Sequence, residues 1–150
     1  MSATTATNHG CLEISQALLR GERSAVQTYD QAIEKFSGEP EVHRLHDLRR
    51  EHVASVEDLE ARVLEMGGAP DQDSGAWGTF ANTVQAAANL FGENAALTAL
   101  LQGENHGRKD YEDALEGDQL MPECRENMER SLLPRVLRNI EILEELRSQN

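Results

Sequence analysis

Two glutamates, Glu22 and Glu104, are the residues whose type and position most clearly suggest chemistry. Each lies in a helical heptad pattern at a position where an aliphatic residue is expected. A carboxylate in the core of a helical bundle is costly unless it is paired, protonated or bound to a metal. The two glutamates therefore predict either a metal centre or a buried layer of paired charges.

The metal hypothesis follows from the ligand sets of helical bundles. Dinuclear carboxylate sites take one Glu from each of two helices and a Glu-x-x-His pair from each of the other two. Glu22 and Glu104 fit the single-Glu roles, and His52 lies at a matching level. However, the residue three positions before His52 is Arg49, and the last predicted helix contains no His. A site of Glu22, His52 and Glu104, holding iron, manganese or zinc, is therefore the alternative interpretation.

The favoured interpretation is a polar core layer without a metal. Arg49 is predicted on the same helix face as His52, one turn away, where it could reach Glu22 or Glu104. A bidentate arginine–carboxylate pair satisfies buried oxygens and can fix the register of helices without adding net stability. No cofactor is expected in this case, and no catalytic residue is assigned.

Tyr29 and Tyr111 complete the predicted polar layer. Each lies about two turns, or roughly 10 Å, beyond the glutamate of its own helix. Neither hydroxyl can therefore bond that glutamate. We expect both tyrosines to pack as amphipathic core residues whose hydroxyls find other polar partners.

The elements that position these residues are predicted helices. The first runs over 11–36 and the second over 41–66, with a turn containing Pro40 between them, so the two must pack antiparallel. Gly67-Gly68-Ala69-Pro70 ends the second helix. The apolar stripe of the first helix is Leu18, Glu22, Ala25, Tyr29, Ala32 and Phe36, and that of the second is Val42, Leu45, Arg49, His52, Val56, Leu59, Val63 and Met66.

A second hairpin is predicted over 93–147, with helices at 93–116 and 122–147. Pro122 suits a first helical position, whereas Pro134 should kink the last helix. The intervening stretch 67–92 is long enough to run back along the bundle as a crossover and to carry a short extra helix. The apolar stripe of the last helix is Leu132, Val136, Ile140 and Leu143.

The two hairpins share an internal repeat. Leu18-Leu19-Arg20-Gly21-Glu22 is echoed by Leu100-Leu101-Gln102-Gly103-Glu104, and each motif is followed by a Tyr and an Ala at the same spacing. These G-E-x6-Y-x2-A elements, the Gly-Gly-Ala-Pro break, the crossover tryptophan Trp77 and the Leu-rich last helix resemble one uncharacterised bacterial family of ferritin-like four-helix bundles, domain of unknown function 2383. The resemblance extends from about Leu12 to Leu146. It implies a ferritin-like bundle, with no established activity.

Composition and charge limit the possible partners. The chain has 150 residues, with 27 acidic and 14 basic side chains and a formal charge of -13. This charge argues against nucleic-acid binding and against docking on an anionic membrane. No apolar run is long enough to span a bilayer, so we expect no membrane insertion and a cytoplasmic location.

The predicted organisation is an all-α protein with a single domain. Residues 1–10 read as a mobile tail and 11–150 as one bundle domain, made of the hairpins 11–66 and 93–147 joined by 67–92. Cys11 and Cys124 have no second cysteine near them in the sequence, so we expect them to be buried, unreactive thiols.

Three functional hypotheses follow. The first is a non-catalytic bundle with a structural, stress-associated or partner-binding role, and the second is a metal-dependent oxidase or iron-handling protein. The third is a binder of a small ligand at the centre of the bundle, where Gly21, Gly103 and Gly107 could leave space. A homodimer is also possible. The apolar residues predicted on the extra helix, Trp77, Phe80 and Phe91, could then either cap the bundle or join two copies.

Overall fold

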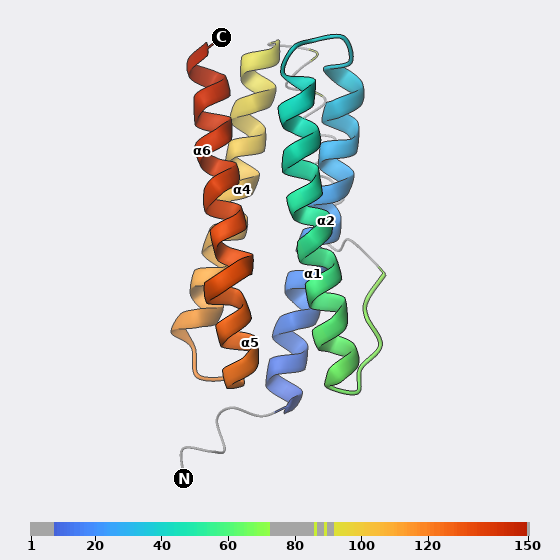
Figure 1. Cartoon of the computed structure of the whole chain (residues 1–150), viewed down its shortest axis with the longest axis vertical. Helices are drawn as coiled ribbons and strands as arrows, with labels where there is room; N and C mark the ends of the chain where they lie inside the picture. The colour runs from blue at the N-terminus through green and yellow to red at the C-terminus, as the bar shows by residue number, and fades with distance from the viewer. Residues whose placement is uncertain (1–7, 73–85, 87–88, 90–91, 150) are drawn as a thin grey trace.

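The computed structural model describes residues 8–72, 86, 89 and 92–149, and all regular elements in these ranges are helical (Figure 1). The predicted all-α four-helix bundle is confirmed. The tail, the short extra helix and its aromatic residues fall largely outside the described residues. The elements are α1 (Asn8–Lys35), α2 (Val42–Glu65), α4 (Glu93–Glu116), α5 (Pro122–Asn127), the π-helical turn η3 (Met128–Leu132) and α6 (Leu133–Gln149).

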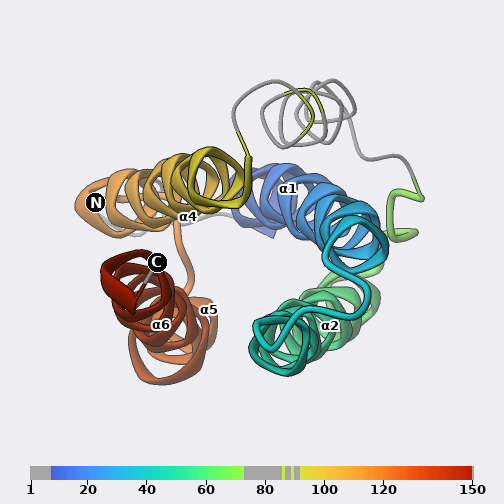
Figure 2. The same cartoon turned by 90° about the horizontal axis from the view of Figure 1, so that it is seen from above.

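The helices form two antiparallel hairpins that lie side by side. Viewed from above, α1 lies between α2 and α4, and α6 lies beside α4 (Figure 2). Figure 1 shows α2 and α4 running in the same direction. The closest packing is within the hairpins, α1 with α2 and α4 with α6, while α1 against α4 and α2 against α6 join them. The bundle thus has four helical rods, namely α1, α2, α4 and the continuous stretch of α5, η3 and α6. Each rod presents one face to a shared core.

The first hairpin ends where its glycines predict. The backbone N–H of Gly68 bonds to the carbonyl of Val63 over 3.0 Å, and that of Gly67 bonds to Leu64 over 3.0 Å. With Gly67 at φ 84°, this is a Schellman motif, which closes the end of α2. The chain beyond turns back along α1, because Gln16 bonds to the carbonyl of Ala69 over 2.7 Å.

The last helix, in which a kink at Pro134 was predicted, is irregular just before this residue and contains a π-helical turn. A proline has no N–H, and its ring collides with the carbonyl four residues earlier. Just before it, the π-helical turn Met128–Leu132 separates α5 from α6, and the N–H of Leu133 bonds to the carbonyl of Met128. The helical rod thus continues from Pro122 to Gln149 with an irregular turn before the proline.

The buried face of α2 differs from the predicted stripe. Leu48 and Ser55 are buried, whereas Arg49 and Val56 are only partly so. Successive helical residues point about 100° apart. The buried face of α2 is therefore shifted by one residue toward the N-terminus at these two turns. The prediction of Arg49 on the stripe was wrong for this reason. The buried residues of α2 are Leu45, Leu48, His52, Ser55, Leu59 and Val63.

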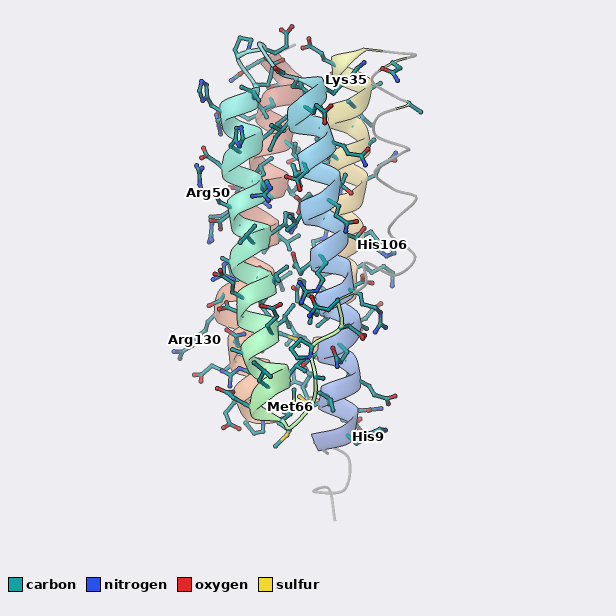
Figure 3. The ribbon with its side chains drawn as sticks, turned by 90° about the vertical axis from the view of Figure 1, so that its right-hand side faces the viewer. His9, Lys35, Arg50, Met66, His106 and Arg130 are labelled. Carbon is teal, nitrogen blue, oxygen red and sulfur yellow. The ribbon has the colours of Figure 1, made fainter. Side chains whose placement is uncertain are left out.

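Charged residues cover the outside of the bundle. Arg50, His106 and Arg130 point away from it, while His9 and Met66 mark one end and Lys35 the other (Figure 3). Among the described helices, none has the length and apolar character needed to cross a membrane.

Candidate functional site

Polar side chains from all four rods meet in the middle of the core. Glu22 lies on α1, His52 on α2, Glu104 on α4 and Asn139 on α6, and none of these residues is more than 6% exposed. Tyr29 and Tyr111, each 2% exposed, complete the group. We call this group the central layer, and its members are Glu22, Tyr29, His52, Glu104, Tyr111 and Asn139.

His52 bridges the two carboxylates. Its Nδ1 lies 2.5 Å from Oε1 of Glu22, and its Nε2 lies 2.7 Å from Oε2 of Glu104. A ring nitrogen that faces a carboxylate oxygen at this distance carries a proton and donates a hydrogen bond to that oxygen. Because both nitrogens face carboxylates, we assign the doubly protonated imidazolium to His52.

The electrostatic environment supports this assignment. Burial alone would lower the pKa of His52, since it penalises the charged ring. The charges of Glu104 and Glu22, together with their hydrogen bonds, outweigh this effect and raise the pKa well above the ordinary value of 6.5. His52 thus provides the positive charge that the sequence pattern predicts for Arg49.

The tyrosines connect the two repeats crosswise. Tyr29 donates a hydrogen bond of 2.5 Å to Oε2 of Glu104, and Tyr111 donates one of 2.6 Å to Oε2 of Glu22. The ring of Tyr29 also stacks on His52, with centroids 5.4 Å apart. The expectation that each hydroxyl finds a partner other than the glutamate of its own helix is confirmed.

Both hydroxyls are held in the neutral form. Burial raises the pKa of Tyr29 well above its usual value, and the charge of Glu104 raises it further. Burial raises the pKa of Tyr111 in the same way, with Glu22 as the second cause. The two tyrosines therefore remain hydrogen-bond donors rather than phenolates at neutral pH.

Asn139 is the member of the layer that sequence reasoning missed. Its amide nitrogen donates to Oε2 of Glu104 over 3.2 Å and lies 3.3 Å from Nε2 of His52. The signal was present in the sequence, because Leu132, Val136, Asn139 and Leu143 alternate spacings of four and three. The predicted stripe used its apolar neighbour Ile140 instead.

One carboxylate oxygen of the layer is left without a bond. Oε1 of Glu104 and Oδ1 of Asn139 are buried with no hydrogen-bond partner. A pocket of about 40 Å³ adjoins the layer, and its walls include Gly21, Gly103 and Gly107. This volume accommodates water or an ion, whereas a benzene-sized ligand needs about 150 Å³.

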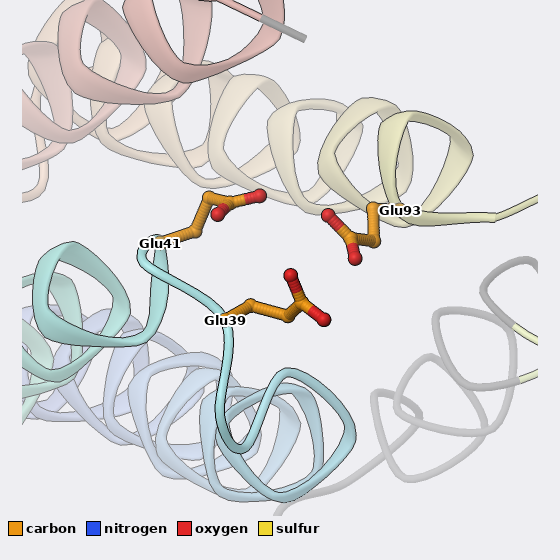
Figure 4. A group of neighbouring side chains, drawn as sticks. All are labelled: Glu39, Glu41 and Glu93. Atoms are coloured by element: carbon orange, nitrogen blue, oxygen red, sulfur yellow. The ribbon is translucent and has the colours of Figure 1, made fainter.

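The predicted metal ligands do not converge on one point. The carboxylates of Glu22 and Glu104 contact opposite nitrogens of the His52 ring, so His52 separates them. Among the described residues, one group of three acidic, histidine or cysteine side chains has its ligand atoms all within 4.8 Å of one another, and it consists of Glu39, Glu41 and Glu93 (Figure 4). We call this group the end cluster. Its residues come from the α1–α2 turn and from the start of α4, away from the central layer.

The arginines lie outside the central layer. Arg49 bonds instead to Asp30 over 2.5 Å near the surface, where its side chain is 35% exposed. Arg135 donates to Asp58 over 2.8 Å and to Ser55 over 3.2 Å. The structure therefore brings together Glu22, His52, Glu104 and both tyrosines, and it excludes Arg49 because of the rotated face of α2.

The two cysteines are buried free thiols, as predicted, and they are also neighbours. Cys11 and Cys124 are far apart in the sequence, but their sulfur atoms lie 2.8 Å apart in the core. The packing of the first turns of α1 against the start of α5 brings them together. Sequence spacing carries no information about such a contact.

Fold and site together define an all-α four-helix bundle with a buried carboxylate–histidine–tyrosine layer. The chain belongs to the family described as Domain of unknown function (DUF2383), whose model matches residues 11–117. This confirms the family resemblance found in the sequence. No curated protein and no solved structure matches the chain.

Proposed function

We propose that the protein is a non-catalytic, ferritin-like bundle in which the central layer takes the place of a di-metal site and holds the four helices in register. The observation that carries this proposal is the engagement of both His52 nitrogens by carboxylates from two different helices. A ring used in this way has no lone pair left for a metal. Its role in the cell would then be structural or partner-binding.

The layer suits a role in setting register because each bond depends on a different helix. Glu22 on α1 accepts from α2 and α4, and Glu104 on α4 accepts from α1, α2 and α6. Sliding any helix by one turn would separate these partners by about 5.4 Å and leave buried charges unpaired. Apolar packing alone tolerates such a slide more easily than a fixed set of donors and acceptors.

A metal-binding bundle using Glu22, His52 and Glu104 is the second candidate. It is favoured by the unbonded Oε1 of Glu104 and by the adjoining pocket of about 40 Å³. Metal ligation would require His52 to lose a proton and to release one of its two carboxylates. Iron, manganese or zinc would suit the histidine and carboxylate donors.

Metal loading separates the two candidates. Purified protein is incubated with Fe(II), Mn(II) or Zn(II), freed of excess metal and analysed for bound metal. The same is done for Glu104→Ala, which disrupts the central layer, and for Glu93→Gln, which alters the end cluster. We expect Glu104→Ala to retain the same amount of metal as the wild-type protein.

Each possible outcome decides the question. Retention that is equal in wild type and Glu104→Ala but reduced in Glu93→Gln assigns the metal to the end cluster and supports the proposal. About one or two metals per chain that are lost in Glu104→Ala and kept in Glu93→Gln would overturn it. Circular dichroism of each variant checks that the bundle has folded.

A further inference from the structure

Cys11 and Cys124 form a pair of thiols at one end of the bundle. They are separated by 113 positions in the chain, yet the thiol of Cys11 donates to the sulfur of Cys124 over 2.8 Å. Both are buried, at 0% and 5% exposure. The pair lies outside the central layer, which uses no sulfur atom.

We propose that Cys11 and Cys124 are a modification site that hydroperoxides convert into an intramolecular disulfide. Bonded sulfurs lie about 2.05 Å apart, so the sulfurs need to approach by less than 1 Å. The two residues come from α1 and α5, which belong to different hairpins. The bond would therefore link the first hairpin covalently to the second.

The chemistry is a two-electron oxidation with a hydroperoxide as the oxidant. One thiolate attacks the peroxide, the O–O bond breaks, and a sulfenic acid forms with release of an alcohol, or of water when the oxidant is hydrogen peroxide. The second sulfur attacks the sulfenic sulfur, the S–O bond breaks, the S–S bond forms, and water leaves with the remaining proton. Two thiols are oxidised and one peroxide is reduced.

The surroundings make this reaction slow and selective. Burial, together with the hydrogen bond and the charge of Cys11, raises the pKa of Cys124 to about 12, and Arg62 only partly opposes this. Little thiolate is present at neutral pH, and thiolate is the form that reacts. A small oxidant such as hydrogen peroxide reaches such a site more readily than a bulky disulfide does.

The test uses the full-length, fully reduced protein treated with hydrogen peroxide under native conditions. Remaining thiols are then alkylated in denaturant, and peptides are mapped without reduction. Peptide mapping is preferred to intact mass, because the chain also contains 4 oxidisable methionines. We expect both alkylation sites to be lost together and a peptide pair joining Cys11 to Cys124 within one monomer.

Cys11→Ser and Cys124→Ser are the matched controls. Each retains one buried thiol and should give no linked peptide in the monomer. Independent alkylation of both wild-type thiols after oxidation would overturn the proposal. So would conversion to separate sulfinic or sulfonic acids, or a disulfide that joins two chains.

Thermal unfolding provides a second measurement that requires no variant. A disulfide that closes a long loop in its native geometry stabilises the folded state. The oxidised protein should therefore melt several degrees above the reduced protein, and dithiothreitol should reverse the gain. An oxidised protein whose melting temperature does not fall when dithiothreitol is added would contradict the juxtaposition of the two thiols in the folded chain.

Discussion

The central layer and the end cluster both gather acidic side chains from different parts of the chain, but they balance negative charge in different ways. In the central layer, His52 supplies a positive charge between Glu22 and Glu104, and each tyrosine donates a hydrogen bond to one of the two carboxylates. The end cluster consists of three glutamates, Glu39, Glu41 and Glu93. There, a hydrogen bond that protonated Glu93 donates to Glu41, then burial and the neighbouring charges, raise the pKa of Glu93 to about 7.

This difference shows what burial demands of a carboxylate. In the core, an unpaired charge costs too much, so partners from several helices are held around each glutamate. Near the surface, solvent screens the repulsion, and a shared proton is sufficient. The proximity of acidic side chains therefore does not by itself identify a functional centre.

Removal of His52 should produce the largest effect. His52→Leu leaves two buried carboxylates without a cation, and we expect a loss of about 3–5 kcal/mol in the free energy of unfolding. Urea denaturation measures this loss. Replacing Glu22, His52 and Glu104 together by leucine should recover much of it, because no charge is then left buried. A loss below about 1 kcal/mol in His52→Leu would contradict the assigned charge pairing.

The tyrosines should differ from each other. Tyr111→Phe removes the hydroxyl that bonds to Oε2 of Glu22, and hydrogen bonds to charged groups contribute about 1.5–3 kcal/mol. Tyr29→Phe should cost less, because His52 and Asn139 still bond to the same oxygen of Glu104. Urea denaturation of both variants, side by side, tests this order. Equal losses would contradict the described network.

Stability should fall as the pH rises above neutral. The pKa of His52 is raised in the folded state, so its stabilising effect is complete below the unfolded value of about 6.5 and is lost as the pH rises through the folded pKa. The slope is at most about 1.4 kcal/mol per pH unit for one proton. Urea denaturation of wild type and His52→Gln between pH 7 and 9 isolates this effect, since the tyrosines titrate only above about 10. A constant difference between the two proteins would contradict it.

The smallest effect should come from the end cluster. Glu93→Gln removes one like charge and keeps an amide that can donate to Glu41. We expect a gain of roughly 0.5 kcal/mol or less at pH 8, because screening at the surface is strong. The gain should vanish below the unfolded carboxyl pKa of about 4.3, where the glutamates are protonated. Thermal unfolding at both pH values measures this gain. A loss of stability in Glu93→Gln at pH 8 would show that repulsion between the glutamates does not destabilise the wild-type protein.

Much of the fold could be predicted because its signals are local. The heptad spacing of Leu18, Glu22 and Tyr29 correctly identified the buried face of α1. The glycines after α2 and the proline at the start of α5 correctly marked helix ends. These features depend on backbone conformation and on helical periodicity, both of which the sequence expresses directly.

The partners within the site could be predicted less completely. Arg49 and Leu48 are adjacent, and either fits a helical stripe with Leu45, so the sequence could not fix the rotation of α2. The crosswise bonds from Tyr29 and Tyr111 depend on the axial alignment of α1 with α4, which spacing within one helix does not determine. The contact between Cys11 and Cys124 likewise depends on tertiary packing.

The protonation state of His52 tests the central claim most directly. Nitrogen-15 NMR of the labelled imidazole, recorded across neutral pH, distinguishes the doubly protonated ring from either neutral tautomer. We predict that both Nδ1 and Nε2 carry protons and that the ring does not titrate near its ordinary pKa of about 6.5. A ring that loses a proton near that value, or that has one unprotonated nitrogen at neutral pH, would contradict the assignment of His52 as the buried cation between Glu22 and Glu104.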